Sequence, residues 1–281
     1  MFNNTPPKIY VSKILDAEIN AIPRSAIELT SGVDGYIVND AIDGLSRPDA
    51  DISISALAGA NASRISGSHI NERNIVFSII PIPNTDFARE CLYYNLPFNT
   101  MLRFYFVRHK KAVFIDGYIE KLSGAFKPGK PFVFTVSVLC PFPWFQSVEL
   151  HSMALVVGEN TLKYNGDIPA GFTLTVPAQK HPPVLGSVED LSLTIGGKTF
   201  AYEGTISIPT ICTIPGSKSF TGVRRIIGNL RAPAFGALKN GSEWVTISWE
   251  NKTMTVSCSD ATKSFFEQQN VLTWRDTYSG V

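Results

Sequence analysis

The sequence predicts an all-β fold with one short helix, divided between two domains. Three observations support this prediction. Apolar and polar residues alternate along many short segments, as in strands that bury one face. Turn-forming pairs separate these segments at short intervals. Finally, the chain lacks the long helical patterns that a mixed α/β fold needs between its strands.

The alternation predicts half-buried strands. In the first of these segments, Ile52 and Ile54 alternate with Asp51 and Ser53, so we expect the isoleucines on a buried face and Asp51 toward solvent. The clearest such segments are residues 51–56, 132–138, 172–176, 191–195 and 245–249.

Glycine pairs mark the turns between these strands. Gly196-Gly197 and Asn240-Gly241 are candidates for two-residue hairpins, because both central positions of a type I′ turn need a positive φ. Asn165-Gly166 is a further turn signal.

Residues 86–95 form the one predicted helix. Thr85 is the expected N-cap, and Pro97 ends the helix because proline cannot continue it. A predicted apolar stripe at positions i, i+4 and i+7 consists of Phe87, Cys91 and Tyr94. We expect this stripe to cover a sheet.

A proline-rich exit from a long strand marks the predicted domain boundary. Pro141 and Pro143 in the segment Cys140-Pro141-Phe142-Pro143-Trp144-Phe145 remove the amide donors that a strand needs. New short strands begin after Gln146. We therefore expect an N-terminal domain over residues 1–146 and a C-terminal domain over residues 147–281.

The charge balance argues against a nucleic-acid-binding protein. Lys plus Arg number 25 and Asp plus Glu 24, which gives a formal charge of +1. Tight binding to phosphates needs clustered positive charge, and the doublets Lys110-Lys111 and Arg224-Arg225 are too short to supply it. Charged residues make up only 17%, below the usual value of about 25%. Such a low charge suits a surface covered by partners, although a large β core has the same effect.

No apolar run approaches the roughly 18 residues of a membrane span. The N-terminus lacks the charged start and apolar core of a signal peptide. We expect a soluble protein without an export signal.

The cysteines indicate free thiols. Cys91, Cys140, Cys212 and Cys258 are widely spaced and contain no C-x-x-C pair. Cys258 follows an alternating run and should share a face with its apolar residues, Met254 and Val256. Buried free thiols fit synthesis in a reducing cytoplasm.

No arrangement of residues indicates an enzyme, and we predict no catalytic, cofactor-binding or metal-binding residue. The histidines lack metal-ligand spacing, and Gly216-Ser217-Lys218-Ser219 lacks the spacing of a phosphate loop. Asp49 and Asp51 could share a strand face, but catalytic carboxylates normally come from different elements. The four histidines are His69, His109, His151 and His181.

The tryptophans leave two interpretations open. Rings exposed beside polar groups could stack on sugars, whereas core or interface packing is the more common role. The four are Trp144, Trp244, Trp249 and Trp274.

Several segments, in the same order along nearly the whole chain, resemble the bacteriophage distal tail protein family. In the N-terminal part they are residues 43–50, residues 71–76, the helix with Arg89 and Leu92-Tyr93-Tyr94, and residues 101–106 and 115–120. The exit segment 140–145 is similar to the C-P-x-P-aromatic exit of that family, residues 165–171 to the opening of its second domain, and residues 272–281 to its aromatic-Gly-Val ending.

This resemblance implies a non-enzymatic structural virion protein that forms a homohexameric ring at the distal end of a phage tail. It implies a tail-tube-like β-sandwich or split barrel, called the belt, followed by an outward-facing galectin-like β-sandwich. The implied partners are the tail tube protein, the tail-tip hub and receptor-binding proteins. Assembly would take place in the cytoplasm of the bacterial host. The extreme C-terminus of such proteins packs back on the first domain.

One departure bears on sugar binding. Galectins bind sugar through a signature of the H-x-N-P-R type, and the nearest string here, His181-Pro182-Pro183, lacks the Asn and Arg. We therefore expect the outer domain to dock proteins. The alternatives are a lectin-like adhesin with exposed Trp249 or Trp274, a tail-tube or tail-terminator subunit, and a tail-tip hydrolase.

Overall fold

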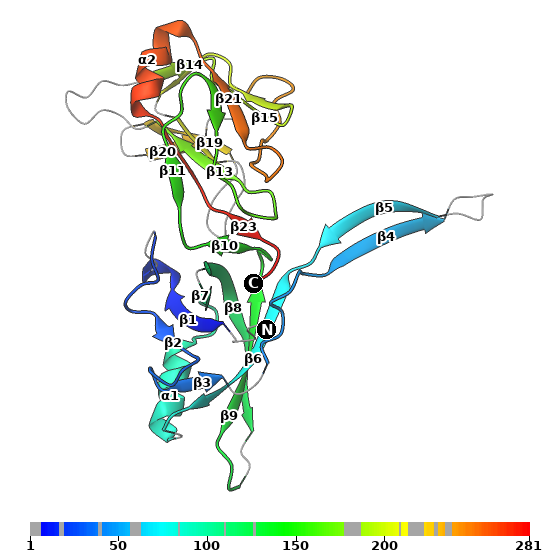
Figure 1. Cartoon of the computed structure of the whole chain (residues 1–281), viewed down its shortest axis with the longest axis vertical. Coiled ribbons are helices and arrows are strands. Elements are labelled where there is room, and N and C mark those ends of the chain that lie inside the picture. Colours follow the sequence, from blue (N-terminus) through cyan, green and yellow to red (C-terminus); the bar gives the residue numbers. More distant parts are fainter. Residues whose placement is uncertain are drawn as a thin grey trace. The chain divides into compact units, whose positions relative to one another are not determined.

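The computed structural model describes residues 7–16, 20–38, 41–56, 63–83, 85–109, 111–125, 128–176, 187–207, 209–212, 222–227, 230–233 and 238–281. Strands dominate these residues, which confirms the predicted all-β class (Figure 1). The chain divides into two compact units. Unit 1 comprises Met1–Val148 and Tyr278–Val281, and unit 2 comprises Glu149–Thr277. None of the helices within the described residues is long and apolar enough to span a membrane.

Unit 1 contains a large antiparallel sheet with the strand order β2-β1-β7-β8-β9-β6-β3. The short β10 pairs with β8, and the 3-10 turn Ile14–Asp16 follows β1. The strands are β1 (Lys8–Lys13), β2 (Ile27–Glu28), β3 (Tyr36–Val38), β6 (Arg73–Pro81), β7 (Met101–Arg108), β8 (Lys111–Ala125), β9 (Val133–Cys140), β10 (Phe145–Ser147) and, at the end of the chain, β23 (Thr277–Tyr278).

One face of this sheet forms the core of unit 1. In β6 every second residue from Arg73 to Pro81 is buried, as a half-buried strand requires. The register pairs Phe77 with Val136 of β9 and Ile75 with Val138, so their side chains share the buried face. The predicted strand 132–138 is thus confirmed as β9.

Helix α1 (Asp86–Asn95) confirms the predicted helix, its bounds and its cap. The Thr85 hydroxyl accepts a hydrogen bond from the Ala88 amide at 3.3 Å. The predicted stripe is wrong, because Phe87 and Tyr94 are 74% and 75% exposed while Leu92 is fully buried. The helix is turned by about one residue, or roughly 100°, from the expected orientation, so that a compact leucine packs into the core and the aromatic side chains face outward.

Strands β4 (Ala50–Ala56) and β5 (Ser63–Ile70) form a separate two-stranded sheet. It extends away from the main sheet of unit 1 as an arm (Figure 1). The expectation of a half-buried strand is wrong here, since Ile52 and Ile54 are 56% and 66% exposed. The alternation is real, but no described part of the chain covers the apolar face.

Unit 2 has two larger sheets and one small one. Their strand orders are β11-β22-β13-β18-β19-β20, β12-β21-β15-β16 and β14-β17. The strands are β11 (His151–Met153), β12 (Gly158–Thr161), β13 (Phe172–Thr175), β14 (Ser187–Glu189), β15 (Ser192–Ile195), β16 (Lys198–Ala201), β17 (Thr205–Ser207), β18 (Pro209–Cys212), β19 (Gly222–Ile227), β20 (Leu230–Pro233), β21 (Thr253–Ser257) and β22 (Val271–Trp274).

The two larger sheets of unit 2 share one core. Leu174 and Leu272 from the first sheet lie in the same buried cluster as Leu193 and Met254 from the second. Two of the predicted strands are confirmed as β13 and β15. In the predicted strand 245–249, Val245 and Ile247 are buried as expected, but Trp249 is 61% exposed. The segment forms only an isolated bridge between Ile247 and Ala170.

A second helix, α2 (Asp260–Gln269), was not predicted. Its buried side chains are Thr262 and Phe266. The Thr262 hydroxyl accepts a hydrogen bond from the Glu189 amide and donates one to the Ser259 carbonyl. Because one of its two buried residues is polar, α2 lacks the apolar stripe that identifies a helix in the sequence.

The predicted turns have different outcomes. Gly196 and Gly197 both have positive φ, 57° and 80°, and join β15 to β16, which confirms this hairpin. Around Asn240-Gly241 only the glycine has a positive φ, 83°, and Ser242 donates to Lys239 across the turn. The pair therefore forms a turn of the type II pattern rather than type I′.

Candidate functional site

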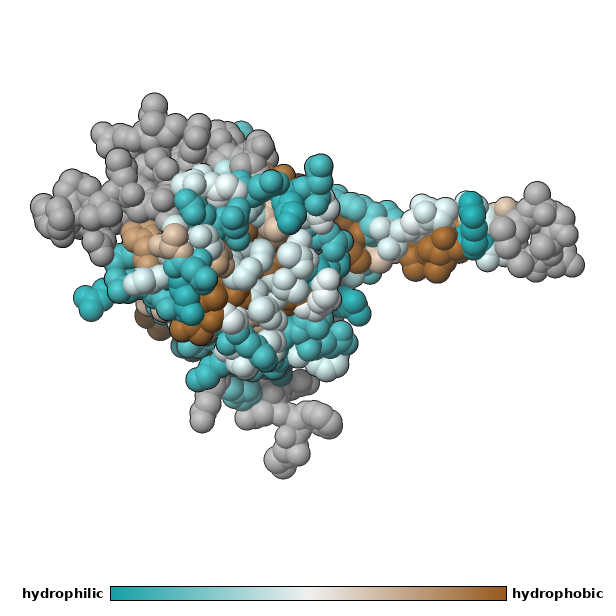
Figure 2. Space-filling view, turned by 90° about the horizontal axis from the view of Figure 1, so that it is seen from above, coloured by the Kyte–Doolittle hydropathy of each residue, from teal (hydrophilic) through white to brown (hydrophobic). Residues whose placement is uncertain are grey.

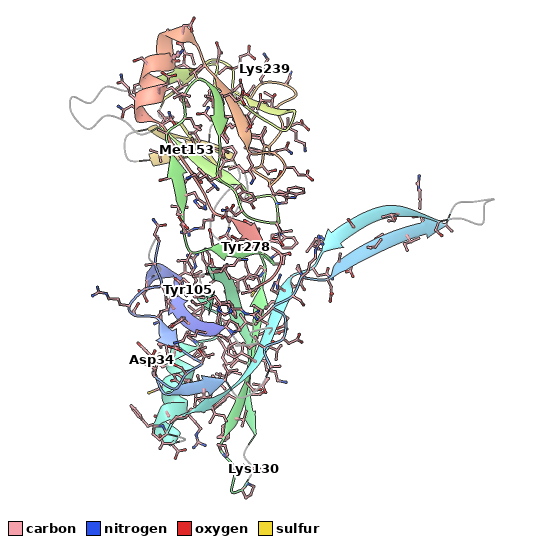
Figure 3. All side chains as sticks on the ribbon, in the orientation of Figure 1. Asp34, Tyr105, Lys130, Met153, Lys239 and Tyr278 are labelled. Carbon is pink, nitrogen blue, oxygen red and sulfur yellow. The ribbon has the colours of Figure 1, made fainter. Side chains whose placement is uncertain are left out.

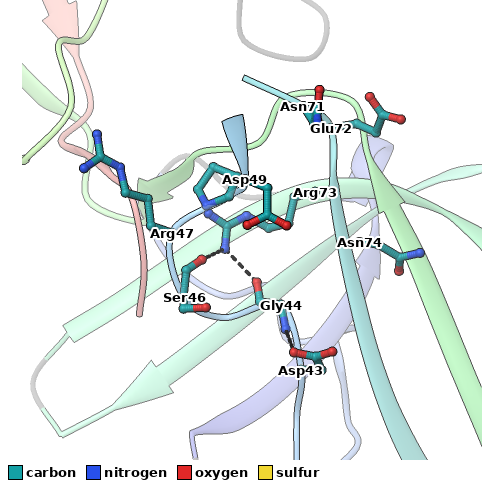
Figure 4. A pocket seen from close by; sticks show the side chains of 10 residues that line it. Asp43, Gly44, Ser46, Arg47, Asp49, Asn71, Glu72, Arg73 and Asn74 are labelled. Atoms are coloured by element: carbon teal, nitrogen blue, oxygen red, sulfur yellow. Dashed lines mark hydrogen bonds between the residues drawn. The ribbon is translucent and has the colours of Figure 1, made fainter. Parts of the chain in front are cut away.

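Arg73 of β6 is the centre of a buried hydrogen-bond network in unit 1, called the Arg73 network. It is only 3% exposed. Its Nε donates to the Pro143 carbonyl at 2.7 Å, and its Nη2 donates to that of Ser279 at 2.6 Å. Its Nη1 donates to the carbonyls of Gly44 and Ser46, both at 2.6 Å (Figure 4). The planar guanidinium thus joins four chain segments.

The charge of Arg73 is held without a carboxylate among these acceptors. Burial lowers the pKa of Arg73 to about 10, so the side chain is still a cation at neutral pH. Carbonyl dipoles surround its edge, and its central carbon lies 4.5 Å from the centre of the Phe145 ring. The Arg73 side chain therefore holds chain segments together and is not poised for proton transfer.

The loop that contacts Arg73 depends on Gly44. Gly44 has φ +79°, and a Cβ atom there would collide with the Asn74 carbonyl. The Asp43 carboxylate accepts a hydrogen bond from the Gly44 amide at 2.8 Å, and the Asp43 amide donates to the Val76 carbonyl at 2.8 Å. The loop therefore lies directly on β6.

The last four residues dock on the same loop. The Val281 amide donates to the Leu45 carbonyl at 3.1 Å, and Gly280 approaches that carbonyl closely. Tyr278, which is labelled in Figure 3, and Val281 pack against the core of unit 1. The Lys111 Nζ lies 3.3 Å from the centre of the Tyr278 ring. Four of the segments that carry the family resemblance therefore meet at Arg73. They are residues 43–50, 71–76, 140–145 and 272–281.

A polar pocket of about 460 Å³ lies beside the Arg73 network (Figure 4). Asp49 lines this pocket together with Asp43, Glu72 and Arg47, whereas Asp51 lies on β4 opposite His69. Across the described part of the chain, no group of three His, Cys, Asp or Glu side chains is placed to hold a metal ion.

The arm is amphipathic. One face carries Ile52 and Ile54 of β4, with Ile65 of β5 directly opposite Ile54. The other face carries Asp51 opposite His69. Figure 2 shows the apolar side chains as a brown patch on the arm. The full apolar face consists of the cross-strand pairs Ala50–Ile70, Ile52–Ser68, Ile54–Ile65 and Ala56–Ser63.

A β-bulge is responsible for this one-sided distribution. The register shifts between Ser53 and Ile54, so that Ser66 is an extra residue on β5, and its hydroxyl donates to the Ser53 carbonyl at 3.1 Å. In an unbroken register Ile65 would lie on the polar face, because side chains alternate along a strand. The bulge instead brings Ile65 to the apolar face, where it is 69% exposed.

Helix α1 presents a second exposed apolar surface in unit 1. It carries Phe87, Tyr93 and Tyr94, of which Tyr93 is 50% exposed. Tyr93 makes an edge-on contact with Phe134, and the Lys13 Nζ lies 5.2 Å from the Tyr94 ring centre. These contacts cover the aromatic side chains only in part.

The aromatic residues of unit 2 divide between core and surface. Trp274 is 4% exposed and stacks on His151 with ring centres 5.4 Å apart. Trp244 stacks on Phe200, and Trp249 is 61% exposed. The packing interpretation is thus confirmed for Trp274, whereas Trp249 is exposed.

The other residues named from the sequence lie apart. His69 is on the exposed arm, and His109 has φ 53° at the end of β7. His181, Lys110 and Gly216-Ser217-Lys218-Ser219 are outside the described residues, as are the side chains of Arg224-Arg225. Cys91, Cys140 and Cys258 are free thiols, and Cys258 packs against the same core cluster as Met254 and Val256, as predicted. The side chain of Cys212 is outside the described residues.

Comparisons with known proteins identify the fold. No protein-family model matches the sequence, and no curated protein matches it. Among solved structures, the chain is similar to the Dit protein of phage SPP1, described as a paradigm of the hub adsorption apparatus in phages that infect Gram-positive bacteria. The identity is 14% and the TM-score 0.65, over 96% of this chain and 98% of that one.

The chain is also similar to a chain of the phage P2 baseplate in its activated conformation, in structures with Ca and with Sr. Both matches have 8% identity and cover 99% of this chain and all of the other. The TM-scores are 0.52 and 0.51. The family resemblance read from the sequence is confirmed at the level of the fold.

Proposed function

We propose that the chain is a bacteriophage distal tail protein, a structural virion subunit that forms a hexameric ring at the tail tip. The full-length fold likeness to the SPP1 hub protein supports this proposal. So does the meeting, at Arg73, of segments that resemble the family but lie far apart in the sequence. Neither observation depends on local composition.

The observation that carries the proposal is the amphipathic arm. A two-stranded ribbon is marginally stable alone in water, and exposed apolar faces mark interaction sites. The arm extends from its own sheet and carries its isoleucines on one face. A second copy of the chain would cover this face. Such a contact joins two different surfaces, and a closed ring results when the rotation between neighbours is regular.

The proposed ring has a belt of first units around a channel. The formal charge of +1 suits a channel through which DNA must slide without binding. The tail tube protein would bind one side of the ring and the tail-tip hub the other. The second unit, proposed as a galectin-like sandwich, would dock receptor-binding proteins. No catalytic step is part of this function.

The proposal is tested by the solution mass of the purified chain. Light scattering should give six copies of the 30.8 kDa chain, about 185 kDa. Ile54→Asp places a charge on the apolar face of the arm and should give smaller species. Ser53→Asp is the matched control, because it places the same charge on the next residue, on the polar face, and should preserve the mass.

A strict monomer at every concentration of the wild-type chain would contradict the ring. Equal loss of assembly in Ile54→Asp and Ser53→Asp would contradict the role of the apolar face. Circular dichroism of both variants excludes unfolding as the cause of any change.

A second candidate function, a lectin-like adhesin, is favoured by one observation, the 61% exposure of Trp249. An exposed indole beside polar side chains can stack on a sugar ring. Trp249 adjoins Glu250 and Asn251, and the turn is closed by the Asn251 amide, which donates to the Ser248 hydroxyl at 3.1 Å. Micromolar binding on a glycan array that is lost in Trp249→Ala would favour this alternative.

A further inference from the structure

The arm and α1 adjoin opposite ends of β6. The arm strand β5 ends at Ile70, β6 runs from Arg73 to Pro81, and α1 begins at Asp86. The nine residues of β6 span roughly 26 Å, because a strand rises about 3.3 Å per residue. The arm also points away from α1 (Figure 1). The arm of one copy therefore does not cover its own α1.

The exposed side of α1 is aromatic. Phe87 and Tyr94 are seven residues apart, about two helical turns, so they lie on the same side of the helix. Their exposed fractions are 74% and 75%. Cys91 falls between them on that side and is partly exposed. These three residues are called the α1 face. Apolar groups gathered on one side of a helix mark a contact surface.

The arm and the α1 face match in size and in number. The seven residues of β4 span about 20 Å along the arm. The ten residues of α1 span about 15 Å. One arm is thus long enough to cover one helix. Each copy has one arm and one α1 face, so in a closed ring every arm meets one α1 face and neither surface is left over.

We propose that the apolar face of the arm packs against the α1 face of the neighbouring copy. It rests on the proposed ring and adds the surface that receives the arm. Ile54 and Ile65, the directly opposed pair on the arm, lie against the rings of Phe87 and Tyr94. A helix on one face of a sheet buries the apolar side of both elements. A two-stranded ribbon gains from such a cover the stability that it lacks alone.

This contact is directional. The arm and the α1 face are different surfaces, so each copy gives its arm to one neighbour and its α1 face to the other. A contact of one arm with another arm would instead be symmetric and would end at two copies. The two arrangements are therefore distinguished by how many chains a covalent bond across the contact can link.

The first test places a charge on the α1 face. Phe87→Asp should give smaller species than the wild type by light scattering, as Ile54→Asp does on the arm. The helix tolerates this change, because Phe87 is exposed and lies in the first turn, where an acidic side chain is favourable. Phe87→Leu is the matched control, since it keeps an apolar side chain and should preserve the wild-type mass. Circular dichroism shows that both variants are folded.

The second test uses the native thiol of the α1 face. In Ile54→Cys, mild oxidation should link the new thiol to Cys91 of the next copy, because the two Cα atoms come within about 7 Å. A non-reducing gel should then show a ladder from two to six chains, and peptide mapping should identify Cys91. Ser53→Cys, on the polar face of the arm, should give no ladder. Adding Cys91→Ser to Ile54→Cys should abolish the ladder.

Two results would overturn the assignment of the α1 face while leaving the ring intact. One is a Phe87→Asp chain with the wild-type mass of about six copies, when Ile54→Asp is smaller. The other is an Ile54→Cys ring that forms no disulfide with Cys91, or in which bonds between two arms stop at two chains. A wild-type chain that is a monomer at every concentration would instead contradict the proposed ring itself.

Discussion

At the scale of single residues, the most constrained position is Arg73. A guanidinium can donate five hydrogen bonds in one plane, and here four of them reach carbonyls on three other segments of unit 1. An ammonium is a point donor on a flexible stem and cannot reach all four acceptors. The identity of this residue therefore matters more than its charge.

Arg73→Lys should lower the free energy of unfolding of unit 1 by about 3–5 kcal/mol, because it leaves buried polar groups without partners. Urea denaturation measures this change in free energy, and hydrogen exchange in β6 and β9 shows that it belongs to unit 1. The control is Arg47→Lys, an exposed residue of the neighbouring pocket, which should stay within about 0.5 kcal/mol of the wild type. Equal stability of the two variants would contradict the stabilising role of the Arg73 network.

Cys140 is a second residue with a defined chemical state. Burial raises the pKa of the Cys140 thiol to about 12, so the folded chain keeps it neutral at pH 8. The thiol of the unfolded chain ionises at lower pH than the buried thiol. The free energy of unfolding therefore falls as the pH rises above the usual thiol range. Alkylation with iodoacetamide at pH 8 should therefore label the partly exposed Cys91 well before Cys140. Labelling of Cys140 at the rate seen in urea would contradict this.

At the scale of elements, the sequence predicted those features that depend on neighbouring residues alone. The cap residue Thr85 and the stop at Pro97 gave the bounds of α1, because capping depends only on neighbouring residues. The buried face of α1 depends on the sheet beneath it, and Leu92 rather than Phe87 fits there. The arm has the alternation of a half-buried strand, but no described part of the chain covers its apolar face.

The cap of α1 is open to a direct test. Thr85→Ala removes the acceptor for the Ala88 amide and should lower the free energy of unfolding of unit 1 by about 1 kcal/mol. Thr85→Ser keeps an acceptor and should retain most of the stability. Thermal denaturation compares the variants, and no difference between them would mean that solvent satisfies the amide equally well.

At the scale of the whole molecule, the sequence predicted the fold class and the order of the resembling segments, but not how they meet. Residues 272–281 and 43–50 are separated by most of the chain, and only the structure shows both at Arg73. The exposed surfaces on the arm and on α1 also escaped prediction. Periodicity identifies apolar faces but does not state whether the same chain covers them.

We propose that copies of this chain close into a sixfold ring, and electron microscopy of the purified chain is the decisive test. We expect class averages with six equivalent subunits around a central hole, and we expect this ring to be lost in Ile54→Asp but not in Ser53→Asp. Single particles of one subunit, or open chains of variable length, at concentrations where the protein is fully folded would contradict it.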